Sequence, residues 1–217
     1  MPFATSFIGE TRSTLDGGNA NMARIEPLPY ERWDAEIKQL CHGETVSAYD
    51  ESTIGVMAKA PKLLKAMMSF QAALARHGQL MPRLRELVRL RVAFHNQCRS
   101  CMAVRYKAAI DDGLTEGLVC SLEKPEEASD LTPREKAALA YADLASTDHF
   151  AIDDATFTML REHFSESEII ELGLLVASCI GFGRFGASLH MVDALPETYK
   201  QSGRITPWTH APAVIGG

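Results

Sequence analysis

The apolar positions of this chain follow a helical period from about residue 25 to about residue 196. The segment 61–77 shows the pattern clearly, since it opens with proline, is followed by glycine, and places on one face Leu64, Met67, Met68 and Ala72. Apolar residues at this spacing predict amphipathic helices. No segment alternates apolar and polar residues long enough to predict a strand, so the sequence indicates an all-α helical bundle.

Capping and helix-breaking residues set the expected boundaries of the helices. Pro29, Pro61 and Pro82 stand in the first turns of three predicted helices, and a fourth is expected from about Cys98 to Asp112, before Gly113. Asn96 and Gln97 mark the turn between the third and the fourth. Two capping boxes, Thr132 with Glu135 and Ser165 with Glu168, open two later helices. The last of these is apolar nearly all round, which predicts a place in the domain centre or at a subunit interface.

The chain divides into three parts by composition. Residues 1–24 are polar and lack periodicity, which predicts a flexible N-terminal arm, and Met22 is an alternative start to Met1. Residues 25–196 form the predicted helical domain, and 197–217 are a C-terminal tail. With 217 residues, 46% of them apolar, the chain can bury a sizeable core.

Charge and hydropathy exclude several classes of partner. A formal net charge of −6 argues against nucleic-acid binding, and the basic run Arg83, Arg85, Arg89 and Arg91 is interpreted as a solvated or ion-paired helix face. The N-terminus lacks the pattern of a secretory signal. The longest apolar run, at about residues 172–182, is too short for a bilayer, which takes about 20 residues. We therefore expect a cytoplasmic protein with no membrane partner.

Two of the five cysteines, Cys98 and Cys101, stand three positions apart at a predicted helix start. This spacing brings both sulfur atoms within disulfide reach, and the positive end of a helix favours a thiolate. A thiolate attacks peroxides and disulfides, and close cysteine pairs in a reducing compartment are typical of redox or metal chemistry. The pair therefore favours redox chemistry.

Two other interpretations of the cysteines stay open. The pair could be core packing, because free cysteine is often buried, and packing is preferred for the isolated Cys41, Cys120 and Cys179. The second interpretation is a metal site, because His95 precedes the pair in the order H-x-x-C-x-x-C. A structural zinc site, however, needs four ligands.

Simple hairpin geometry predicts the neighbours of the pair. If the helices before and after Asn96 and Gln97 are antiparallel, Glu86 faces the turn of helix that carries Arg105. Arg105 also stands four residues after Cys101, on the same helix face. The spacing therefore predicts a line of groups formed by Glu86, Arg105 and Cys101.

A glutamate, eleven residues and then Cys-x-x-Cys resembles the carboxymuconolactone decarboxylase superfamily, particularly its alkylhydroperoxidase D-like members. The resemblance extends over about residues 22–190, through segments such as LMPRLRELVRLRVAFHNQCRSCMAVRYKAAIDDGL and LTPREKAALAYADL. It implies an all-helical homo-oligomer, commonly a trimer or hexamer, that needs no bound cofactor. It also implies that Cys101 attacks a small hydroperoxide or disulfide substrate, Cys98 resolves, Glu86 belongs to a proton relay, and a dithiol or protein donor restores the pair.

The chain departs from the family pattern at Arg105, where the relay histidine would fall. Arginine stays protonated and cannot pass a proton, so it could only stabilise a thiolate or pair with Glu86. This predicts weak peroxidase activity or a redox-sensing role, with His95 as the nearest alternative base. The helix dipole favours Cys98, not Cys101, as the more acidic thiol, so which cysteine attacks stays open. Two alternatives remain: a cofactor-free lyase in which Arg105 holds a substrate carboxylate, and a non-enzymatic redox-sensing oligomer.

Overall fold

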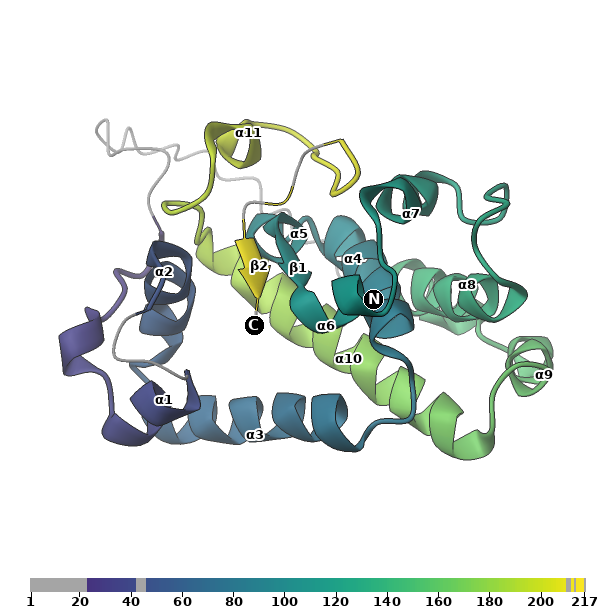
Figure 1. Cartoon of the computed structure of the whole chain (residues 1–217), viewed down its shortest axis with the longest axis horizontal. Helices are drawn as coiled ribbons and strands as arrows, with labels where there is room; N and C mark the ends of the chain where they lie inside the picture. Colours follow the sequence, from purple (N-terminus) through teal and green to yellow (C-terminus); the bar gives the residue numbers. More distant parts are fainter. Residues whose placement is uncertain (1–22, 42–45, 210–211, 213, 217) are drawn as a thin grey trace, which may run out of the picture.

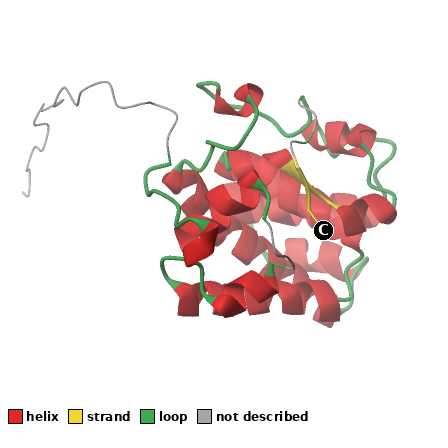
Figure 2. Cartoon of the chain, turned by 60° about the vertical axis from the view of Figure 1, so that its left-hand side comes forward, coloured by secondary structure: helices red, strands yellow, loops and turns green. Residues whose placement is uncertain are grey.

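A long central helix, α10 (Glu166–Leu189), crosses the molecule and packs along α4 (Pro82–Asn96) (Figure 1). The computed structural model describes residues 23–41, 46–209, 212 and 214–216. Helices make up most of this part of the chain (Figure 2), and the all-α fold class is confirmed. The other helices are α1 (Ala35–Leu40), α2 (Ala48–Met57), α3 (Pro61–His77), α5 (Arg99–Ala103), α6 (Lys107–Asp111), α7 (Glu116–Cys120), α8 (Pro133–Thr147), α9 (Asp154–Arg161) and α11 (Glu197–Lys200).

The main core lies where α4, α8 and α10 meet. Both predicted capping boxes are present: the Thr132 hydroxyl accepts the Glu135 N–H at the start of α8, and Ser165 accepts the Glu168 N–H at the start of α10. Each cap satisfies backbone donors that a helix start leaves without partners. Fully buried side chains from the three helices form the core, among them Leu87, Leu90, Ala138, Leu139 and Leu172.

The helix expected over residues 98–112 is interrupted, which corrects the prediction. α5 ends at Ala103, a short strand β1 (Val104–Tyr106) follows, and α6 begins at Lys107. β1 pairs in parallel with β2 (Val214–Gly216), with Arg105 opposite Ile215. The β-branched Val104 and the aromatic Tyr106 are favoured in extended backbone, and the pairing supplies hydrogen bonds that a helix would have made internally.

Two further segments differ from expectation at the N-terminal side. The helix expected from Pro29 is divided into a 3-10 turn, Tyr30–Arg32, and α1, because Asp34 caps α1 by accepting the Glu36 N–H. The expected arm lies outside the described residues up to residue 22, and the Arg24 N–H donates to the Leu189 carbonyl at the end of α10.

The C-terminal tail packs onto the domain beside α5. Tyr199 is buried, and the Arg99 guanidinium donates to the carbonyls of Tyr199 and Gly203. The Ile205 N–H donates to the Gln97 side chain at the turn before the cysteine pair. The tail therefore holds the loop that carries the cysteines.

By length and apolar composition, α10 alone among the described helices could cross a membrane. The same test is passed by core helices of globular proteins, and one side of α10 is packed against α4 and α8. That burial explains the apolar character of this side of α10, whereas Ile170 and Phe185 on the same helix are exposed.

Candidate active site

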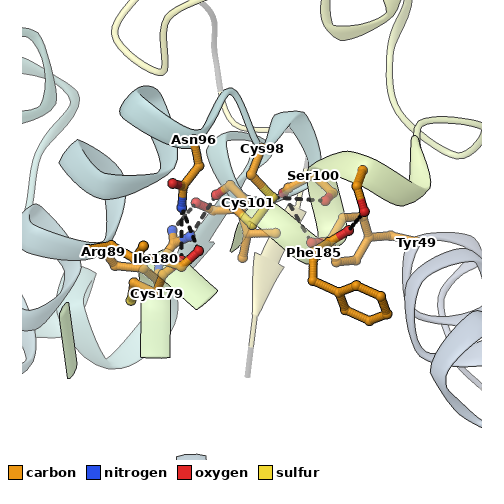
Figure 3. The surroundings of a disulfide bond; sticks show 11 residues. Tyr49, Arg89, Asn96, Cys98, Ser100, Cys101, Cys179, Ile180 and Phe185 are labelled. Atoms are coloured by element: carbon orange, nitrogen blue, oxygen red, sulfur yellow. Dashed lines mark hydrogen bonds between the residues drawn. A yellow bond between two sulfur atoms is a disulfide. The ribbon is translucent and has the colours of Figure 1, made fainter. Parts of the chain in front are cut away.

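The two cysteines of the C-x-x-C pair are joined in a disulfide at the start of α5 (Figure 3). α4 ends at Asn96, and the left-handed backbone of the next residue, Gln97 (φ 51°), turns the chain so that Cys98 becomes the N-cap of α5. The two Cα atoms are 5.2 Å apart, as the spacing predicted. Cys98 is fully buried, whereas Cys101 is only partly buried. A molecule that approaches the disulfide therefore meets Cys101 more easily.

Two glycines of α10 let this helix approach the pair closely. A Cβ atom on Gly183 would lie 2.5 Å from the Asn96 side-chain nitrogen, and one on Gly186 would lie 3.8 Å from the Cys98 sulfur. The Asn96 amide uses the space at Gly183 to donate to the Cys179 carbonyl of α10 at 2.9 Å (Figure 3). This contact fixes the turn before the cysteines against the central helix.

The disulfide lines an apolar cavity of about 220 Å³ between α2, α3, α5 and α10. Most of the wall is hydrocarbon or sulfur, including Met57, Met67, Phe182 and Met191. Arg89 supplies the charge in this wall. Polar groups come from Tyr49, Ser100, Tyr106 and Ser178 among others. A mostly apolar pocket with a few converging polar groups is the usual form of a small-molecule site.

A buried ion pair clamps the backbone of Cys101. Arg89 donates from Nε and Nη2 to the two carboxylate oxygens of Glu86, each at 2.7 Å, and from Nη1 to the Cys101 carbonyl at 2.6 Å. Glu86 is 2% exposed. Burial alone would lower the pKa of Arg89, but the Glu86 carboxylate outweighs it and raises the pKa above the ordinary value. The guanidinium is thus permanently charged, with its Nη1 edge toward Cys101.

Tyrosine side chains flank the disulfide on both sides. The Tyr49 hydroxyl donates to the Ser100 carbonyl at 3.1 Å, and Tyr49 lies across the disulfide from Arg89 (Figure 3). Burial raises the pKa of Tyr49, so its hydroxyl stays protonated near neutral pH. On the other side the Arg89 guanidinium lies 5.0 Å from the centre of the Tyr106 ring.

The predicted contact between Glu86 and Arg105 is wrong. The five guanidinium N–H groups of Arg105 make five hydrogen bonds: two to Glu116, at 3.0 and 3.1 Å, and one each to the carbonyls of Met102, Val104 and Pro207. Arg105 is 0% exposed. The break in the helix after Ala103 turns this side chain away from the face that carries Cys101, so Arg105 joins β1 to α7 and the C-terminal tail.

His95 is held by a carboxylate outside the cavity wall. Its Nε2 lies 2.6 Å from Oδ1 of Asp143 on α8, and Arg91 pairs with the same carboxylate. Burial would raise the pKa of Asp143, but the hydrogen bonds from His95 and Arg91 lower it below the ordinary value. Within the described residues, no group of three His, Cys, Asp or Glu is arranged to hold a metal.

The other cysteines have different surroundings. Cys179 lines the cavity, and burial raises the pKa of its thiol to about 11. Cys41 is partly buried and packs with the cluster around Trp33. Cys120 is exposed at the end of α7, so the core interpretation of this cysteine is wrong.

A second cavity of about 380 Å³ lies beside the first. α3, α4, α6 and α10 form its wall, and it shares with the first cavity Gln71, Arg89, Tyr106 and Cys179. Glu86 and Arg85 line this second cavity only. The ion pair of Glu86 and Arg89 therefore stands between the two spaces.

The sequence pointed to Glu86 and the two cysteines but missed Arg89 as their link. The basic run was interpreted as a solvated or ion-paired face, and Arg83, Arg89 and Arg91 are indeed ion-paired. The available signal was the spacing of Glu86 and Arg89, three residues apart on one helix, which brings such side chains into contact.

Comparison with known proteins supports the resemblance stated from the motif. The sequence model of the carboxymuconolactone decarboxylase family matches residues 61–144, which include Glu86, Arg89 and both cysteines of the pair. An uncharacterized protein of Mycobacterium tuberculosis is 40% identical over 105 residues, 48% of this chain and 36% of the relative. The match thus spans about a third of that relative. Protein YdfG of Bacillus subtilis, also uncharacterized, is 25% identical over 60% of this chain and 88% of its own.

Solved structures share the fold. A protein of unknown function from Agrobacterium tumefaciens, described as a candidate antioxidant defence protein AhpD, is 26% identical with a TM-score of 0.54, over 61% of this chain and 92% of its own. A peroxidase-related protein from Ralstonia eutropha with an alkylhydroperoxidase AhpD core has a TM-score of 0.64 at 18% identity, over 85% of this chain and 97% of its own. The debrominase Bmp8 has a TM-score of 0.61 at 18% identity, over 75% of this chain and 88% of its own. The resemblance to the carboxymuconolactone decarboxylase family and to alkylhydroperoxidase D-like proteins is thereby confirmed.

Proposed function

We propose that this protein, which resembles the carboxymuconolactone decarboxylase family, is a thiol-dependent oxidoreductase that reduces hydroperoxides with Cys101 and Cys98. The observation that carries the proposal is the position of the disulfide in the wall of an apolar cavity, beside the Arg89 guanidinium. A cysteine pair used only for packing would need neither a cavity nor a charged neighbour.

The proposed reaction begins with the Cys101 thiolate. It attacks one oxygen of a hydroperoxide, the O–O bond breaks, and the alkoxide leaves as an alcohol after it takes up a proton. Cys101 is then a sulfenic acid, and attack by the Cys98 sulfur forms the disulfide and releases water. The peroxide has been reduced by two electrons and the two thiols oxidised by two electrons.

The burial of the two sulfurs supports Cys101 as the attacking residue. Both sulfurs line the cavity, but Cys98 is 0% exposed and lies beside Gly186 of α10, whereas Cys101 is partly exposed. The Nη1 edge of Arg89 lies toward Cys101, and the Glu86 carboxylate lies on the opposite Nε and Nη2 edge. The positive end of this ion pair therefore faces the backbone of Cys101, and it lines the same cavity as the sulfur whose thiolate it would stabilise.

The reduced pair is restored by a dithiol donor, either a small molecule or a protein of the same compartment, which we propose to be the cytoplasm. The donor thiolate attacks the accessible Cys101 sulfur, the disulfide breaks, and Cys98 leaves as a thiolate. The second donor thiol then displaces Cys101, so the donor ends as a disulfide and the protein as a dithiol.

The lyase alternative loses its basis in the sequence. It required Arg105 to hold a substrate carboxylate in two hydrogen bonds, but all five donors of Arg105 are engaged within the protein. Arg105 therefore has no free donor with which to hold a substrate carboxylate.

The test is a thiol count on the reduced protein before and after one equivalent of hydroperoxide. Two thiols per chain are expected to disappear, with Cys98 and Cys101 recovered in one disulfide by peptide mapping. In the variant Cys98→Ser, Cys101 should instead accumulate as a sulfenic acid that a dione probe labels. Cys101→Ser should lose the reaction.

The matched control is Cys120→Ser, because this exposed free cysteine is the competing site of simple surface oxidation. It should react as the unmodified chain does. If peroxide consumes no thiols, or consumes them equally in Cys101→Ser, the proposed function is wrong.

A further inference from the structure

The second cavity contains a cation without a carboxylate partner in the part of the chain that the structure describes. Arg85 stands on the inner face of α4, partly buried, and its Nη1 donates to the Leu74 carbonyl near the end of α3 at 2.6 Å. No ion pair to Arg85 is formed by any described residue. The other three arginines of the same run, Arg83, Arg89 and Arg91, are each paired with an acid.

The groups around Arg85 leave its positive charge without compensation, which favours the binding of an anion. Glu86 is the carboxylate of the cavity wall, but both of its oxygens are occupied by Arg89. Arg89 also lies four residues after Arg85, one turn along the same helix, where like charges repel. The two arginines and one glutamate leave the second cavity with an excess of one positive charge.

The remaining wall of this cavity is mostly apolar. Ala72, Leu74 and Ala75 come from α3, Ala108 and Ala109 from α6, and Leu175 from α10. An apolar space with one cationic end is complementary to an apolar molecule with one anionic end. The contact of Arg85 with Leu74 uses one of five guanidinium donors, so the planar Nε and Nη2 edge remains for two parallel hydrogen bonds to a carboxylate.

The sizes and positions of the two cavities are consistent with a ligand that has an apolar body and one anionic end. The first cavity, at about 220 Å³, is smaller than the roughly 300 Å³ at which ligand sites usually begin, whereas the second, at about 380 Å³, falls within that range. Arg85 and Arg89 are about 6 Å apart along the axis of α4, since a helix rises about 1.5 Å per residue. Arg89 in turn touches the backbone of Cys101.

We propose that the second cavity binds the carboxylate end of an apolar carboxylic acid at Arg85, so that its other end extends past Arg89 and Tyr106 toward Cys101. The site thus binds the acid as an anion, and more tightly than the corresponding neutral alcohol. Resting on the proposed function, this inference makes the preferred substrates hydroperoxides of apolar carboxylic acids, but the binding itself needs no redox step.

The test is isothermal titration calorimetry of the full chain, in its disulfide form, with 4-phenylbutyrate and with the neutral 4-phenylbutan-1-ol. The carboxylate is expected to bind at least about tenfold more tightly than the alcohol, because a charge-assisted pair of hydrogen bonds is lost with the alcohol. Arg85→Gln keeps a donor for the Leu74 carbonyl but removes the charge. It should weaken carboxylate binding by about tenfold or more and leave alcohol binding unchanged.

Arg76→Gln is the matched control, because Arg76 carries the same charge at the exposed end of α3 and lines neither cavity. It should bind both probes as the unmodified chain does. Equal affinity for the two probes, no binding of the carboxylate, or full binding by folded Arg85→Gln would overturn the inference. Because binding is measured on the disulfide form, which has no reduced pair to react with peroxide, a failure of peroxide reduction and a failure of this site are told apart.

Discussion

Replacing Glu86 by glutamine separates two roles that its position allows. As a relay base, Glu86 would take a proton during the reaction, and its loss would slow the consumption of thiols by peroxide. As the counterion of Arg89, it would instead moderate the positive charge next to Cys101. The contacts favour the second role, because both carboxylate oxygens are held by Arg89 at 2.7 Å and one also accepts the Tyr106 N–H at 3.3 Å.

The expected magnitudes follow from these contacts. Loss of one partner of a buried ion pair typically costs ~3–5 kcal/mol of unfolding free energy. Because the Arg89 side chain is 15% exposed, we expect a value near the lower end, about 3 kcal/mol, in urea unfolding. If the separation between the Glu86 carboxylate and the Cys101 sulfur is taken as roughly 8 Å and the effective dielectric constant as about 20, removal of the negative charge favours the Cys101 thiolate by ~2 kcal/mol. This corresponds to a thiol pKa lower by about 1.5.

The assay is the rate of alkylation and of peroxide consumption by reduced Glu86→Gln between pH 5 and 9, at a temperature where the variant is folded. The midpoint of the Cys101 profile should move to lower pH, and the rate below the original midpoint should rise. Glu86→Asp, which keeps the charge, should leave the midpoint near its original value. A folded Glu86→Gln with an unchanged midpoint and a rate reduced tenfold or more would show that Glu86 acts as a base and that the ion-pair reasoning is mistaken.

Further expectations concern the surroundings of the site. If the absent relay histidine alone limited peroxide turnover, Arg105→His would raise the turnover. Because this arginine makes five buried hydrogen bonds, we expect instead that the substitution lowers the unfolding free energy by ~3 kcal/mol and does not raise peroxide turnover. Urea unfolding and a peroxide assay measure the two effects. Gly183→Ala should lower the melting temperature, because its Cβ would meet the side-chain amide that joins α4 to α10 at 2.5 Å, whereas Gly186→Ala, whose nearest neighbours lie at 3.6 and 3.8 Å, should not; equal melting temperatures would contradict this. With a thiol pKa raised from 9.0 to about 11, Cys179 should hold about 100-fold less thiolate at pH 8 than an ordinary thiol, so mass spectrometry should find it alkylated far more slowly than the exposed cysteine of α7. Ile170 is 66% exposed on the outer face of α10, and we expect it to lie between copies of the chain in an oligomer. Ile170→Glu should then reduce the molecular mass measured by light scattering. An unchanged mass would show that this face of α10 is not the oligomer interface.

The all-helical fold was predictable because the signals involved are local. Proline and the capping boxes of Thr132 and Ser165 act within one helical turn, so α3, α4, α8 and α10 begin where the sequence indicated. The reach of the disulfide was predictable for the same reason, since Cys98 and Cys101 lie within one turn. The apolar surface of α10 predicted burial, and one of its sides forms the core with α4 and α8.

The partners of the charged residues were not predictable from spacing. The expected line through Glu86 and Arg105 assumed one continuous helix after the turn, but strand pairing with residues 214–216 extends the backbone at Val104–Tyr106. That pairing joins segments more than a hundred residues apart, and no local sequence pattern predicts it. The change of backbone direction rotated Arg105 away from the cysteines.

The sequence by itself determined which helices form and that two sulfurs can meet, because these depend on interactions within a few residues. Only the tertiary structure decided which arginine stands beside the reactive pair, which carboxylate is already occupied, and which cation is left facing an apolar space. Those outcomes depend on how α3, α4, α10 and the C-terminal tail pack together, and a side chain's electrostatic partners are fixed by that packing rather than by its neighbours in the chain.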